Sequence, residues 1–206
     1  MKELKFENIS LELLCHDAVK ISGSKIVCVD PFKINAAFKA DIVVVTHEHY
    51  DHLSAEDIAK VSSEKTKIVC ANSCVPKIGR NARGIAAGET VEADGVKISA
   101  VQAYNTNKKF HPKGGGIGAV IELDGVRVYH AGDTDFIPEM AELGKIDIAF
   151  LPVSGTYVMT AEDAAKAAET IKPKVAVPMH YGSVVGSQAD AKRFAKLFSG
   201  KTEILF

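Results

Sequence analysis

The sequence predicts an α/β fold in which layered β-sheets carry helices on their outer faces. Two observations support this prediction. Apolar runs rich in Val and Ile recur along the 206 residues, and capped helical segments interrupt them. Strands dominate the first half, strands and helices alternate afterwards, and a final strand follows the last helix. Because no linker or low-complexity tract divides the chain, we expect a single domain over residues 1–206.

The expected strands are short apolar segments bounded by turn residues. They lie at 11–14, 25–29, 41–45, 67–70, 96–103, 118–123, 126–130, 146–151 and 174–178. Asp124-Gly125 and Asp94-Gly95 each separate two apolar runs, and such dipeptides are typical of tight hairpins. The sequence does not fix the order of the strands within the sheets.

Three segments carry helix signals. Ser54 and Thr160 are N-cap residues, and each has an acid three residues later, which predicts capping boxes for helices ending near residues 61 and 171. Pro173 ends the second of these helices. A last helix is expected at 188–198, before Gly200.

Composition narrows the class of function. The net charge is -1, so a nucleic-acid partner is not expected. The chain has neither the apolar core of a signal peptide nor a run of roughly 18 apolar residues, so we expect a cytoplasmic protein that does not enter a membrane. A small-molecule substrate is the expected partner, and a homo-oligomer is compatible with the sequence. The four cysteines are expected to be buried thiols.

The most informative segment follows the apolar run at 41–45. Residues 47–52 read His-Glu-His-Tyr-Asp-His, which places three imidazoles and a carboxylate within six residues. Imidazole nitrogen and carboxylate oxygen are ligands that suit zinc, manganese and iron. A lone histidine is more often a satisfied polar group, but this clustering predicts a metal site on a rigid strand end.

Two later strands end in the same kind of residue. The run at 126–130 leads to His130 and Asp133, and the run at 174–178 leads to His180. If these strands are neighbours, their ends converge on one cleft. Asp133 or His180 alone would be ambiguous evidence for a metal ligand, and the 47–52 cluster strengthens the interpretation of each as one.

These motifs together resemble the metallo-β-lactamase superfamily of metal-dependent hydrolases. The resemblance rests on His47-x-His49-x-Asp51-His52, on the 130–135 segment His-Ala-Gly-Asp-Thr-Asp, and on the late His180. It extends to the 14–19 and 29–32 segments and is greatest to small stand-alone members related to L-ascorbate-6-phosphate lactonase. It implies a four-layer αββα sandwich of two mixed β-sheets flanked by helices.

The resemblance also implies a centre for one or two metal ions, with zinc as the expected ion and manganese or iron as alternatives. Matched motif by motif, it assigns ligands to a first position, a second position and a bridge between them. The first position takes His47 and His49, the second takes Asp51, His52 and His180, and Asp133 is the bridge.

One ligand departs from the family pattern. A further histidine is usual after the middle strand, where this chain has Tyr104 and Asn105. Either His111 reaches in from its glycine-rich loop, or Asn105 faces the first metal as a poor ligand. We favour His111, because imidazole binds such metals far better than an amide does. The glycines of the 114–118 stretch are expected to allow a mobile flap or a close backbone approach to substrate.

Four other residue groups are considered near the site. Asp51 is the candidate to orient a metal-bound hydroxide and pass on a proton, in addition to binding metal. Asp30 is expected to accept a hydrogen bond from a ligand imidazole. His16 and His130 are assigned structural roles. Lysines 108, 109 and 113 are interpreted as solvated residues, although one of them could meet an anionic substrate.

The predicted function is therefore hydrolysis of a small ester-, lactone- or phosphodiester-type substrate. Two alternatives remain open at this stage. One is a metal-dependent nuclease of the same superfamily. The other is a non-catalytic metal-binding sensor, an alternative that the absence of the usual histidine after the middle strand supports.

Overall fold

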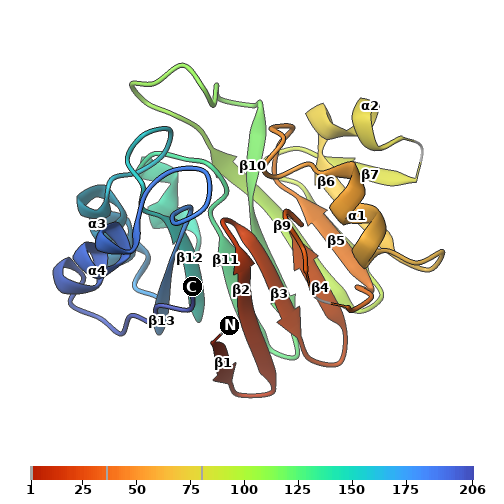
Figure 1. Cartoon of the computed structure of the whole chain (residues 1–206), viewed down its shortest axis with the longest axis horizontal. Coiled ribbons are helices and arrows are strands. Elements are labelled where there is room, and N and C mark those ends of the chain that lie inside the picture. Colours follow the sequence, from red (N-terminus) through yellow and green to blue (C-terminus); the bar gives the residue numbers. More distant parts are fainter. Residues whose placement is uncertain (1, 36, 80) are drawn as a thin grey trace.

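Two mixed β-sheets pack face to face, and helices cover their outer faces (Figure 1). The computed structural model describes residues 2–35, 37–79 and 81–206. Within these residues the first sheet has seven strands in the order β1-β2-β3-β4-β5-β6-β7, and the second has six in the order β13-β12-β11-β10-β9-β8. This arrangement confirms the predicted αββα sandwich.

The first sheet is antiparallel from β1 to β4 and parallel from β4 to β7. Its strands are β1 (Glu3–Phe6), β2 (Ile9–Cys15), β3 (Ala18–Ser22), β4 (Ile26–Val29), β5 (Ile42–Val45), β6 (Lys67–Ala71) and β7 (Ala82–Ile85). The helical elements beside it are α1 (Ala55–Val61), the 3₁₀ turn η1 (Asn72–Cys74) and α2 (Val75–Ile78).

The second sheet is parallel from β13 to β11 and antiparallel from β11 to β8. Its strands are β8 (Thr90–Ala93), β9 (Val96–Ala103), β10 (Gly116–Leu123), β11 (Val126–His130), β12 (Ile148–Pro152) and β13 (Val175–Met179). The helical elements on its side are η2 (Pro138–Glu142), α3 (Ala161–Ile171) and α4 (Gln188–Leu197).

One hydrophobic core extends from the α1 side to the α3 side. Every residue of β5, β12 and β13 is buried, because one face of each strand packs on the opposite sheet and the other packs under the outer layer. Strand β2 alternates more, with Ser10 and Glu12 partly exposed between buried residues. The central strands are therefore apolar on both faces, and their burial holds the layers of the sandwich together.

The structure confirms all nine strand segments predicted from sequence, with ends that shift by one or two residues. Asp124-Gly125 and Asp94-Gly95 form two-residue hairpin turns, in which all four residues have positive φ. Ser54 and Thr160 cap α1 and α3 as predicted. Among the described cysteines all four are buried free thiols, as expected.

Some local predictions were wrong. Neither expected capping box forms: the Asp57 carboxylate accepts from the backbone of Lys33 and Ile34, and the Asp163 carboxylate accepts from Lys166 and the Thr160 hydroxyl. The structure places such a box at Ser187 instead. The expected final strand is reduced to one isolated bridge between Thr202 and Ala176. Strands β1, β3, β7 and β8 and the short helix α2 were not predicted.

The sheet topology brings several strand ends to one edge of the sandwich. Because β4 and β5 are parallel, their carboxyl ends meet, and the same holds for β11, β12 and β13 in the other sheet. The turn between β2 and β3 lies at this edge too, since β3 runs antiparallel to β4. In the described part of the chain, no helix is long and apolar enough to cross a membrane.

Candidate metal centre

Titratable side chains from both sheets meet at this shared edge. They come from six places: His16 and Asp17 in the β2–β3 turn, Asp30 after β4, residues 46–52 after β5, His111 in the loop before β10, Asp133 after β11, and His180 after β13. His16, Asp30 and His180 have φ of 50, 46 and 60°. Left-handed backbone at non-glycine residues is uncommon and concentrates at functional sites.

The first cluster consists of His47, His49, His111 and Asp133, whose ligand atoms all lie within 4.8 Å of one another. His49 Nδ1 is 3.1 Å from Nε2 of both His47 and His111. His111 Nε2 is also 3.1 Å from an Asp133 oxygen. Donors bound at about 2.0–2.1 Å to one tetrahedral cation lie about 3.4 Å apart, so these spacings suit a single cation. We call this the first position.

The sequence left open whether His111 or Asn105 serves the first position, and the structure distinguishes them. Asn105 lies behind His111: its Oδ1 accepts from the His111 backbone N–H and is 3.1 Å from His111 Nδ1. The Asn105 amide donates to the carbonyl of Tyr157, which turns its oxygen toward His111. Asn105 therefore fixes the ring and leaves His111 Nε2 directed at the cluster.

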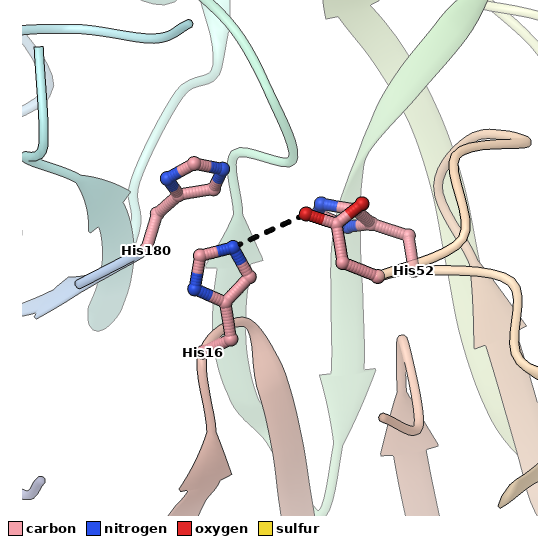
Figure 2. Close-up of side chains that lie close together, drawn as sticks. His16, His52 and His180 are labelled. Atoms are coloured by element: carbon pink, nitrogen blue, oxygen red, sulfur yellow. Dashed lines mark ion pairs between the residues drawn. The ribbon is translucent and has the colours of Figure 1, made fainter. Parts of the chain in front are cut away.

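The second cluster lies deeper. His16, Asp51, His52 and His180 bring ligand atoms within 4.8 Å of one another, and so do Asp17, His52, Asp133 and His180. Figure 2 shows His16, His52 and His180 pointing toward one another from three separate parts of the chain. We call the space shared by these two overlapping groups the second position.

Asp133 lies between the two positions. One of its oxygens is 3.1 Å from His111 Nε2 and 3.2 Å from His180 Nε2, and the other is 3.3 Å from His52 Nε2. A carboxylate with both oxygens so placed can contact two cations at once. The structure therefore brings together all seven side chains that the sequence nominated as metal ligands.

A layer of hydrogen bonds orients the ligand imidazoles. Asp30 Oδ2 accepts from His52 Nδ1 at 2.8 Å, which confirms the contact expected of Asp30. The Thr46 hydroxyl donates to the same oxygen at 2.6 Å, so it must accept from His47 Nδ1, which lies 3.0 Å away. Each ring thereby presents Nε2 to the site. His180 Nδ1 contacts the Ser154 hydroxyl at 2.8 Å.

Burial and mutual charge set the protonation of the cluster. Burial alone would lower the pKa of His52, but the carboxylates of Asp133 and Asp30 raise that pKa well above its usual value. Burial likewise lowers the pKa of His180, but the carboxylates of Asp133 and Asp17 raise it, and the net pKa is about 9. Burial and the neighbouring His52 hold the pKa of His47 well below its usual range.

The buried polar atoms test whether the centre fits a cation. Within the described residues, both ring nitrogens of His16, both oxygens of Asp17, His52 Nε2 and Asp133 Oδ1 have no hydrogen-bond partner. These residues are at most 5% exposed. Buried polar atoms without partners are costly, and a cation among them would satisfy nitrogen and oxygen lone pairs together. The donor set of imidazole and carboxylate fits zinc, manganese or iron.

A pocket of about 270 Å³ opens beside the first position. It is lined by His49, Tyr50, Asp51, Phe110, His111, Asp133, Tyr157 and Val184. The rings of Phe110 and Tyr157 meet edge to face with centroids 4.7 Å apart. Substrate can therefore approach the first position along an aromatic wall.

Three expectations about neighbouring residues need correction or refinement. Gly116 makes its close approach to His47, where an added Cβ would lie 2.9 Å from the histidine Cβ; the sequence suggested an approach to substrate. His130 is 2.9 Å from the carbonyl of Asp17, a supporting contact that agrees with its structural assignment. His16, also assigned a structural role, has its ring inside the second position.

Sequence reasoning overlooked Asp17 and undervalued His16. Both stand in a two-residue turn between apolar strands, a position where polar residues are ordinary. No local sequence signal marks them: the turn falls at the edge that carries the metal ligands because β3 pairs antiparallel with β4, and the sequence does not show this pairing.

The fold and the two clusters define a class of protein, and comparison with known proteins gives its family. A model described as a beta-lactamase superfamily domain matches residues 11–180, and the chain belongs to this superfamily as a metal-dependent hydrolase. A UPF0173 metal-dependent hydrolase of Thermococcus onnurineus is 39% identical, with 96% of this chain and 95% of the relative covered.

Solved structures agree with this assignment. A crystal structure from Parabacteroides distasonis superposes with a TM-score of 0.89 and 34% identity, and the match covers 98% of this chain and 96% of that one. Igni18, a metallo hydrolase from Ignicoccus hospitalis, superposes with a TM-score of 0.76 and 27% identity, with 95% and 94% covered. The closer resemblance to ascorbate-phosphate lactonases stays a prediction.

Proposed function

We propose that this protein hydrolyses a small, uncharged ester or lactone that carries an apolar group, using cations bound at the first and second positions. The proposed ligands are His47, His49 and His111 for the first position, Asp51, His52 and His180 for the second, and Asp133 for both. The observation that carries this proposal is the shared Asp133, which lies within 3.3 Å of ligand nitrogens on both sides.

Divalent cations held at these positions, with zinc as the expected ion, would lower the pKa of a water molecule and polarise the carbonyl oxygen of the substrate. The contribution of Asp51 follows from its surroundings. Burial raises the pKa of Asp51, but His16 and His52 lower it by a larger amount, so the net pKa lies below the usual value. Asp51 is therefore ionised at neutral pH and lines the pocket, where it can accept a proton from the attacking water.

The walls of the pocket favour an uncharged substrate over a phosphodiester. Tyr50 and Phe110 are 67% and 52% exposed, although large apolar side chains are usually covered. Of the nearby lysines, Lys108 is paired with Asp135 and Lys113 with Glu139. These pairs leave less positive charge to attract a phosphate, whereas the aromatic surface can bind an aryl or alkyl group.

A substrate panel tests this proposal. Metal-depleted protein is reloaded with zinc, manganese or iron and assayed on aryl acetates, aryl-substituted γ-lactones and bis-aryl phosphodiesters. We expect metal-dependent turnover, with esters or lactones ahead of phosphodiesters. Asp133→Ala is the inactive variant, and Asp94→Asn, in an exposed hairpin turn, is the matched control that retains activity.

Two results would replace the proposal. Tight cation binding with no turnover of any substrate favours a metal-binding sensor. Cleavage of RNA, accompanied by salt-sensitive RNA binding, favours a nuclease.

A further inference from the structure

We infer that Asp17, in the β2–β3 turn, is an additional ligand of the second position and makes that position richer in carboxylate than the first. The inference rests on the proposed binding of two cations. It adds a residue that the metal-binding motifs do not include.

The first observation is an unpartnered buried carboxylate. Asp17 is 0% exposed, and within the described residues neither of its oxygens accepts a hydrogen bond. Asp30 provides the contrast, because it is equally buried but accepts from the backbone N–H and hydroxyl of Thr46 and from His52. A buried carboxylate without hydrogen-bond partners is costly, and a cation bound beside Asp17 would remove that cost.

The second observation is what Asp17 faces. Its Oδ2 lies 3.5 Å from His52 Nε2, 3.6 Å from His16 Nε2 and 3.9 Å from His180 Nε2. His52 uses its Nδ1 on Asp30, so Nε2 is the ring nitrogen that faces the Asp17 oxygen. Neither of these atoms has a hydrogen-bond partner within the described residues, and a cation between them would be bound by both.

The third observation is how firmly the turn is held. The backbone N–H of His180 donates to the carbonyl of His16 at 3.0 Å, and His130 Nε2 is 2.9 Å from the carbonyl of Asp17. Strand ends of the second sheet thus fix a turn of the first sheet. A ligand that must stay within a few tenths of an ångström of its place needs such support.

Counting Asp17, the second position offers three carboxylates, from Asp17, Asp51 and Asp133, together with imidazoles from His16, His52 and His180. The first position offers three imidazoles and one carboxylate. Oxygen-rich sets with more than four donors suit manganese or iron, whereas the first set suits tetrahedral zinc. We therefore expect the second position to prefer Mn²⁺ or Fe²⁺ and the first to prefer Zn²⁺.

The test compares cation binding by wild type, Asp17→Asn and Asp94→Asn, with Zn²⁺ and Mn²⁺ as probes. Calorimetric titration gives the number of sites, and the electron paramagnetic resonance of Mn²⁺ reports its bound fraction. We expect wild type and Asp94→Asn to bind two cations. Asp17→Asn should keep the first and bind the second at least roughly 10–100-fold more weakly. Unchanged binding of both cations by Asp17→Asn would overturn the inference.

Two further measurements guard against a variant that fails to fold and against failure of the parent proposal. Circular dichroism checks the fold of Asp17→Asn. Independently, a crystal structure of manganese-loaded wild type should place an Asp17 oxygen about 2.0–2.3 Å from the second cation, and a carboxylate clear of that cation would overturn the inference. If wild type itself binds no cation, the proposed function fails; if only the role of Asp17 fails, wild type still binds two.

Discussion

The two cation positions share Asp133 but differ in burial and in the number of carboxylates. The first has three imidazoles, includes the partly exposed His49, and opens on the aromatic pocket. The second is buried, and unpartnered oxygens and nitrogens surround it. If both positions hold cations, as proposed, we expect the first to contact substrate and exchange with solvent, and the second to hold its cation as part of the fold.

Asp133→Ala gives the largest expected effect, because this residue contacts ligands of both positions. We expect both cations to be lost and hydrolysis to fall to background. Elemental analysis after dialysis, alongside the ester assay, measures both quantities. Retention of one cation at full occupancy would show that the two positions are independent.

His111→Ala and Asn105→Ala separate the first position from the second. His111→Ala should empty the first position and leave the second filled. Asn105→Ala removes only the partner of the ring, so affinity at the first position should fall by roughly 10–100-fold. Titration with zinc measures both variants. A larger loss in Asn105→Ala than in His111→Ala would make the amide the ligand.

Proton competition should also distinguish the two positions. His180 has a pKa of about 9, so below that pH a cation entering the second position must displace a proton. Affinity there should rise by at least about tenfold per pH unit from pH 7 to pH 9, because the raised pKa of His52 means that a second proton must also leave. At the first position the lowered pKa of His47 leaves that ring neutral at pH 7, so its affinity should change less. Equal slopes for the two positions would contradict the assignment.

Ser154→Ala gives the smallest effect and concerns the second position alone. Its hydroxyl lies 2.8 Å from His180 Nδ1 and orients that ring. Loss of one neutral hydrogen bond should weaken the second cation by about tenfold and leave the first unchanged. Chelator competition resolves a change of this size, and a matched loss at the first position would argue for a general effect on the fold.

Much of the fold could be predicted from sequence because its central strands are apolar on both faces. The four consecutive Ile and Val residues of β5 predict a buried strand, and the Asp-Gly pairs at Asp94 and Asp124 predict hairpin turns. Strand β8 was missed because Thr90–Ala93 mixes polar and apolar residues over four positions. Short edge strands owe their conformation to pairing with a neighbour, which no local pattern records.

The candidate site shows the same limit. His47 to His52 stood out because ligand-type residues crowd into one segment. Asp17 did not, because its role depends on packing between the sheets, which brings the β2–β3 turn against the ends of β11 and β13. His111 was favoured on ligand chemistry alone, and its contact with Asn105 could be read only from the folded loop.

The most direct test of the central claim, two cation positions that share Asp133, is anomalous diffraction from crystals of protein purified without a histidine tag and soaked in zinc and manganese. The account predicts two anomalous peaks, roughly 3.5–4 Å apart, on either side of the Asp133 carboxylate. A single peak remote from Asp133, or no peak at all, would contradict it.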